Sequence, residues 1–149
     1  MGIEASNEGT SKMKYLEKLE REISSWPEVS AHPHRFGGRE FQYRSAEIGH
    51  AHTGGIVDIP FPRAIREELL LEGLAEEHRW VPNSGWVTYH VHGEEDFNHA
   101  VWLMRLSYLR YALKSAADPR RLLEQYGEKL QLSARLKSLF ESLVPRSIA

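Results

Sequence analysis

The strongest chemical signal in the sequence is a pair of histidines two residues apart, His50 and His52, within the segment 47–61. Side chains at i and i+2 of a β-strand point to the same face, so a strand here would present two imidazoles side by side. An imidazole titrates near neutral pH and can act as a general base or as a metal ligand. Spacing alone also allows a plainer arrangement, in which one ring lies in a polar surface network and the other caps the following turn.

A second pair with the same spacing, His90 and His92, closes a later aromatic-rich segment. If the two strands lay side by side with matching faces, the four imidazoles could approach one another. Asp58 or Glu47 could then add a carboxylate ligand for zinc or non-haem iron. The sequence has no cysteine and no helical zinc-protease spacing, so a metal site built from both pairs is the weaker alternative. The leading expectation from these residues is a site without a metal.

Two further segments contain groups that could bind a ligand. His34 and Arg35 open the segment 34–38, where paired glycines could let backbone amides approach an anionic oxygen. The lysine and Ser/Thr of a phosphate loop are missing, and a simple turn with Arg35 in solvent is the alternative. Trp86 follows the turn signal of residues 82–85 and could form either the wall of a pocket or an anchor in the core.

The composition is that of one globular domain, with 149 residues and 41% hydrophobic content. The lack of cysteine excludes disulfides and thiolate catalysis and fits a reducing compartment. No apolar run approaches the roughly 20 residues of a membrane span, so we expect a soluble, cytoplasmic protein. Residues 105–149 are net positive but lack interleaved aromatic side chains, which favours a small-molecule ligand over nucleic acid. The sequence does not define the oligomeric state.

Hydrophobic periodicity predicts a single α+β domain, in which a mainly antiparallel sheet of about four or five short strands packs against a long core helix. Residues 1–11 are polar and predicted to be flexible, and residues 118–149 are expected to form a helical appendage. The predicted helices cover residues 13–26, 63–73, 94–115, 120–126 and 130–144, and the predicted strands cover residues 40–44, 47–52, 56–59, 78–81 and 86–92.

Five short motifs follow one another along the centre of the chain. They are PHRFGG (33–38), EIGHxH (47–52), DIPFP (58–62), PxSGWV (82–87) and WLxRLSY (102–108). As a set they resemble the luciferase-domain family, whose members are small bacterial and fungal proteins. The resemblance spans roughly residues 32–111, which we expect to form the family core.

The resemblance implies a chemistry for these residues. Fungal members of the family add molecular oxygen to a polyketide-derived pyrone without an obligatory metal or organic cofactor. By this resemblance His50 or His52 would remove an acidic enol proton, and Glu47 would orient that base. The residues expected to bind the substrate are His34, Arg35, Asp58, Trp86 and His90.

Other interpretations remain open at the level of sequence. Asp58 and the short turn after His52 depart from the histidine-rich stretch of the fungal proteins, so light emission is not implied. The order of elements is also similar to that of the small MmcQ/YjbR-type domains, which are proposed to bind nucleic acid. A non-catalytic binding module, for nucleic acid or a protein partner, is therefore the alternative to an oxygenase.

Overall fold

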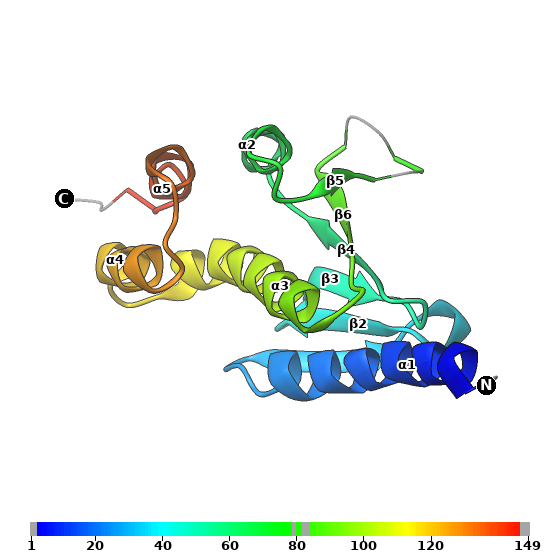
Figure 1. Ribbon diagram of the computed structural model, residues 1–149. Helices are drawn as coiled ribbons and strands as arrows, with labels where there is room; N and C mark the ends of the chain where they lie inside the picture. Colours follow the sequence, from blue (N-terminus) through cyan, green and yellow to red (C-terminus); the bar gives the residue numbers. More distant parts are fainter. Residues whose placement is uncertain (1–2, 79, 82–83, 147–149) are drawn as a thin grey trace.

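The computed structural model describes residues 3–78, 80–81 and 84–146 (Figure 1). Within these residues, six antiparallel strands form one sheet in the order β1-β2-β3-β4-β6-β5, and five α-helices accompany it. The predicted α+β class is confirmed. The strands are β1 (Val29–Pro33), β2 (Arg39–Tyr43), β3 (Ala46–Ala51), β4 (Ile56–Pro60), β5 (Glu76–Glu77) and β6 (Trp86–His90); the helices are α1 (Ile3–Ser24), α2 (Arg63–Leu71), α3 (Glu94–Ser115), α4 (Pro119–Lys129) and α5 (Ala134–Glu141).

The first four strands form an antiparallel meander because short turns connect them. The β2–β3 turn is closed by the pair Tyr43↔Ala46, and the β3–β4 turn by a hydrogen bond from the His52 backbone N–H to the Ile56 carbonyl at 2.8 Å. The chain then leaves the sheet for α2 and returns to add β6 beside β4. The hairpins and central strands therefore lie where the turn residues predicted them.

Both edges of the sheet differ from the prediction. The sequence predicted no strand at residues 29–33, where β1 lies, and it placed a strand at residues 78–81, whereas the edge strand is Glu76–Glu77. Residue 79 of that predicted strand, and residues 82–83 of the turn after it, lie outside the described residues. Edge strands are half solvated, and Pro33 cannot donate a ladder hydrogen bond, so an edge such as β1 shows little of the apolar alternation on which a prediction depends.

Helix α1 begins at Ile3, earlier than the predicted start at residue 13. The added turns include glutamate, alanine and lysine, which are good helix formers, and no proline interrupts them. The helix ends at Ser24, just before the predicted stop at Trp26-Pro27. No described helix is both long enough and apolar enough to cross a membrane.

One face of the sheet packs against α1 and α3 and contains most of the core (Figure 1). Alternate strand residues point toward these helices, and α3 buries two of its faces, as the sequence predicted for a central core helix. The fully buried side chains here include Ile23 from α1, Phe41, Ile48 and Ile59 from the sheet, and Leu103, Met104, Leu106 and Leu109 from α3.

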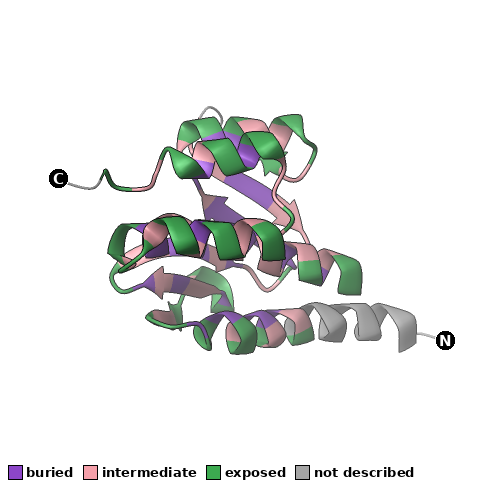
Figure 2. Ribbon diagram, turned by 90° about the vertical axis from the view of Figure 1, so that its left-hand side faces the viewer, coloured by how far each residue is buried: buried purple, intermediate pink, exposed green. Residues whose placement is uncertain are grey.

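Helices α4 and α5 complete this core instead of forming an appendage. Helix α4 packs on α3, and α5 packs on α2 and α4. Leu123, Leu136 and Phe140 are only 3%, 1% and 0% exposed. Figure 2 shows the same pattern, with exposed residues on the outward faces of the helices and buried residues where helices and sheet face one another. The described C-terminal residues therefore belong to the single folded unit.

Candidate functional site

The pairing register places six polar residues in one row across the sheet. Directly opposed residues of antiparallel strands point to the same face. In order along the row, the residues are His32, Glu40, His50, Asp58, Thr88 and Glu76. Their strand neighbours, such as Phe41, Val57 and Val87, are buried on the opposite face. The row therefore lies on the face away from α1 and α3, which we call the site face.

A β-bulge in β3 brings Glu47 to the site face beside His50. The pairing of β3 with β2 shifts by one residue, so Ile48 is inserted between the paired residues Glu47 and Gly49. In a regular strand, residues three apart would point to opposite faces. Here the Nδ1 atom of His50 lies 3.2 Å from Oε1 of Glu47. The bulge thus provides the contact that the expected orienting role of Glu47 requires.

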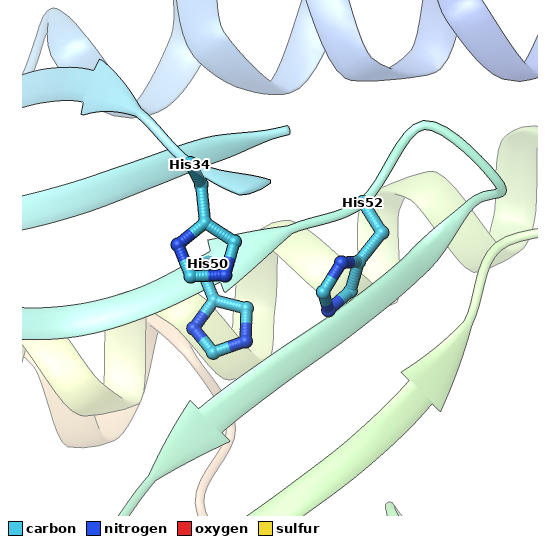
Figure 3. Close-up of side chains that lie close together, drawn as sticks. All are labelled: His34, His50 and His52. Carbon is cyan, nitrogen blue, oxygen red and sulfur yellow. The ribbon is translucent and has the colours of Figure 1, made fainter. Parts of the chain in front are cut away.

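Three imidazoles gather on the site face, as Figure 3 shows. His34 comes from the residue after β1, His50 from β3, and His52 from just beyond the end of β3. The rings of His34 and His50 stack with a centroid distance of 4.2 Å, and the His50 and His52 centroids are 5.0 Å apart. One nitrogen from each ring lies within 4.8 Å of the others. The predicted pair of His50 and His52 is therefore joined by His34 in a cluster of three imidazoles.

Asp58 anchors this cluster from the neighbouring strand β4. Its side chain is largely buried, and its Oδ2 atom lies 2.8 Å from Nε2 of His52 and 3.2 Å from Nε2 of His50. Thr88 donates to Oδ1 at 2.7 Å. An ionised carboxylate only accepts hydrogen bonds, so both Nε2 atoms carry hydrogen. In a neutral His52 ring Nδ1 would be the acceptor, whereas His50, held by Glu47 on its other nitrogen, carries two hydrogens.

The ionisable groups of the cluster have pKa values that are shifted in different directions. Burial alone would lower the pKa of His50, but hydrogen bonds with Asp58 and Glu47 outweigh it and raise this pKa to about 9. Burial would raise the pKa of Asp58, yet hydrogen bonds from His50, Thr88 and His52 hold this pKa well below its usual range. Partial burial, and then the charges of His50 and His52, lower the pKa of His34. The cluster thus combines a buried anion, a cationic ring and a ring that resists protonation.

A cavity of about 1030 Å³ lies over the cluster. His34, His50, His52 and Asp58 form part of its lining, together with the aliphatic Ile56. Phe36 and Trp80 also line it, and these residues are 95% and 78% exposed. This size is at the upper end for small-molecule sites, which measure roughly 300–1,000 Å³ and combine apolar walls with a few polar groups. The cavity can therefore hold an organic molecule of moderate size.

Most residues predicted to form the site meet at this cavity. Those that line it are His34, Arg35, His50, His52, Asp58 and His90. Glu47 and Trp86 contact His50 instead of the cavity, and the Trp86 ring centroid is 5.3 Å from that of His50. Trp86 therefore supports the imidazole and is not the cavity wall that the sequence suggested.

The two histidine pairs do not combine into one cluster. Strand β4 lies between β3 and β6, so the side-by-side arrangement on which the four-histidine metal site depended is wrong. Nδ1 of His90 lies 3.2 Å from Oε2 of Glu76, and exposed His92 stacks on the His90 ring. Among the described residues, the group able to hold a metal ion consists of His34, His50 and His52.

The sequence missed seven residues of the cavity lining, namely Phe36, Ile56, Glu76, Glu77, His78, Trp80 and Thr88. Thr88 could have been found, because it lies two residues from both Trp86 and His90 on one strand. His78, Phe36 and Trp80 come from irregular segments, where no periodicity connects them to the histidines. His78 reaches the cluster through Nε2, which is 3.5 Å from Oδ1 of Asp58.

Comparison with known proteins agrees with the motifs. Residues 45–107 match the family model described as the Luciferase domain. The match includes His50, His52, Asp58 and Trp86, and it leaves His34 outside. The chain gave no match among curated proteins or among solved structures. The predicted resemblance is confirmed over residues 45–107, which are similar to the Luciferase domain.

Proposed function

We propose that the cavity binds a small, planar molecule with an acidic enol group and that the protein oxygenates this molecule. The observation that carries the proposal is the convergence of His34, His50, His52 and Asp58 on one cavity of about 1030 Å³. The match of residues 45–107 to the Luciferase domain supports oxygen chemistry. The exposed rings of Phe36 and Trp80 offer apolar faces on which a planar molecule could stack.

The His52–Asp58 pair is the best placed to accept the enol proton. Asp58 fixes the His52 ring through the 2.8 Å contact with Nε2, and this leaves Nδ1 as the acceptor. His50 is less suited, because both of its nitrogens face carboxylates. The base is then His52, one of the two histidines that the sequence offered, and Asp58 orients it in place of Glu47.

Arg35 and His34 are placed to stabilise the enolate that proton transfer produces. Arg35 is the one arginine among the described residues that line the cavity, and its side chain is exposed. His34 also lines the cavity, and its ring stacks on that of His50. Donors aimed at a developing negative charge lower the barrier to its formation.

The proposed reaction balances without a further reductant. The enol gives its proton to His52, and the electron-rich enolate carbon then transfers electrons to molecular oxygen and forms a carbon–oxygen bond. The bound oxygen is reduced to a peroxide, which takes the proton back from His52 and becomes a hydroperoxide. One substrate and one oxygen molecule thus give one oxygenated product.

Oxygen uptake with a panel of 3-hydroxypyrones and their O-methyl ethers tests this function in EDTA-treated protein. We expect uptake with the free enols and none with the ethers, which have no proton to lose. His52→Ala should lower kcat by about 10²- to 10⁴-fold, the usual contribution of a positioned base. His32→Ala removes an exposed histidine of β1 and should change nothing. Full activity in His52→Ala would overturn the role of His52, and no uptake with any enol would reject the oxygenase.

A non-catalytic binding protein is the second candidate, because the same cavity could hold a ligand without turnover. Calorimetric titration with the same enols separates the two functions. Binding that His52→Ala weakens, without oxygen consumption by the wild type, would favour the binding protein. Oxygen consumption in proportion to bound enol would favour the enzyme.

A further inference from the structure

We infer that His34, His50 and His52 form a binding site for one divalent transition-metal cation. The observation is geometric: three imidazoles from separate points of the chain meet on one face, and one nitrogen of each lies within 4.8 Å of the others (Figure 3). His34 is the ring that completes the group, since the sequence motif supplies only His50 and His52. This site differs from the four-histidine alternative that the strand order excludes.

The rings are close to the spacing of a coordinated cation. Zinc–nitrogen bonds are about 2.0–2.1 Å long, so the nitrogens of a tetrahedral site lie roughly 3.4 Å apart. Closing the observed spacing requires ring shifts of roughly 1 Å, which side-chain rotation can supply. His34 and His52 both lie just outside regular strands, where such adjustment is least restricted. His50 provides the fixed member, because Trp86 and Glu47 hold its ring.

Carboxylates around the cluster are placed as metal sites require. Oδ2 of Asp58 lies 2.8 Å from Nε2 of His52 and 3.2 Å from Nε2 of His50, so this carboxylate lies directly beside two of the imidazoles of the proposed site. Asp58 would also offset part of the cation's charge. Glu47 accepts a hydrogen bond from Nδ1 of His50, the arrangement by which a carboxylate commonly orients a metal-binding imidazole.

The donor set selects the kind of cation. Imidazole nitrogens suit zinc, iron(II) and cobalt(II), whereas magnesium and calcium prefer cages of oxygen ligands. The chain contains no cysteine to draw in softer cations through thiolates. Three imidazoles with a nearby carboxylate therefore favour a borderline divalent cation over a hard one.

Metal binding does not depend on the proposed oxygenase function. A proton and a cation exclude one another at the same imidazole nitrogen, so the metal-free and metal-loaded proteins are distinct states. Only one consequence rests on the proposed function: a bound cation is a Lewis acid that could hold the ionised enol oxygen. The binding test below therefore uses metal salts alone, without any enol.

Calorimetric titration of untagged, EDTA-treated protein with zinc chloride at pH 8 tests the inference. We expect one equivalent of zinc to bind, cobalt(II) to give visible d–d absorption bands, and a hundredfold excess of magnesium not to compete. Single His34→Ala, His50→Ala and His52→Ala variants should each weaken binding by more than the roughly 10- to 100-fold loss expected for Glu47→Gln. The matched variant His32→Ala should bind as the wild type does. Circular dichroism and thermal melting confirm that each variant is folded.

Several results would overturn the inference. Wild-type binding no tighter than that of the folded triple alanine variant would show that the cluster holds no metal. Loss of binding in His90→Ala or His92→Ala, with His34→Ala unaffected, would place the centre elsewhere. If zinc fails to bind while EDTA-treated protein still consumes oxygen with enols, only the metal site fails. If zinc binds as expected and no enol is bound or consumed, only the proposed function fails.

Discussion

At the scale of single residues, Asp58 holds the candidate site together. Its two oxygens receive contacts from four side chains that come from three segments: His50, His52, Thr88 and His78. The side chain is only 8% exposed, so water cannot replace these partners. The sequence suggested Asp58 as a ligand-binding residue. Its geometry adds a structural role, because the carboxylate fixes the orientation of the imidazoles around it.

We predict that Asp58→Asn destabilises the protein even without ligand. The amide has nearly the same shape, but its NH₂ group would face the N–H or O–H donors that the carboxylate accepts. The expected loss is about 1.5–3 kcal/mol of unfolding free energy, as for hydrogen bonds to a charged group. Urea unfolding in EDTA measures it. Thr88→Val removes one donor and should cost about 0.5–1.5 kcal/mol. An Asp58→Asn protein as stable as the wild type would contradict this view of Asp58.

At the scale of elements, the bulge of β3 sets the geometry of the site. It turns Ile48 and Gly49 toward the core and lets Glu47 and His50 share the site face. Gly49 has a φ of 154°, which favours glycine. A Cβ atom there would lie 2.6 Å from Sδ of Met104 and 3.1 Å from the Asp58 carbonyl oxygen. Helix α3 therefore approaches the bulge more closely than any side chain at Gly49 would permit.

We predict that Gly49→Ala costs about 1–3 kcal/mol, because the added methyl overpacks the contact with Met104. Gly54→Ala is the matched control, since its Cβ would meet nothing within 4 Å. Urea unfolding gives both values. In a Met104→Ala background the cost of Gly49→Ala should shrink, which a double-mutant cycle would reveal. Equal costs at Gly49 and Gly54, or an unchanged cost in that background, would contradict the close-approach argument.

Local sequence patterns predict the elements well where local chemistry decides them. The turns at residues 53–55 and the alternation around β4 and β6 are strong signals, and the strands lie there. The same patterns miss β1, whose pairing depends on β2. They also could not join His34 to His50, because the stacking depends on the register Glu40↔His50 and on how the chain turns after Pro33. In the sequence, only Gly49 indicates the bulge that brings Glu47 beside His50.

At the scale of the whole molecule, the two faces of the sheet have different roles: one forms the hydrophobic core, and the other carries the candidate site. One face of the sheet packs on α1 and α3, and the other face carries the polar row. The buried core therefore fixes the positions of the strands, although no core side chain belongs to the site. Helices α2, α4 and α5 extend the same core around α3. The site face then depends on helices that contribute no residue to the cavity lining. A change in the C-terminal helices should consequently affect the whole domain.

We therefore predict that Phe140→Ala, at a fully buried position of α5, lowers the unfolding free energy by about 3–5 kcal/mol. Leu71→Ala is the control, because Leu71 is 81% exposed and should change stability by no more than about 0.5 kcal/mol. Urea unfolding followed by far-UV circular dichroism and by tryptophan fluorescence should give coincident transitions, since we expect the four tryptophans, which include Trp86 beside the site, to lose their packing together with Phe140. An early loss of helix that leaves the fluorescence transition unmoved would instead make α4 and α5 an independent appendage.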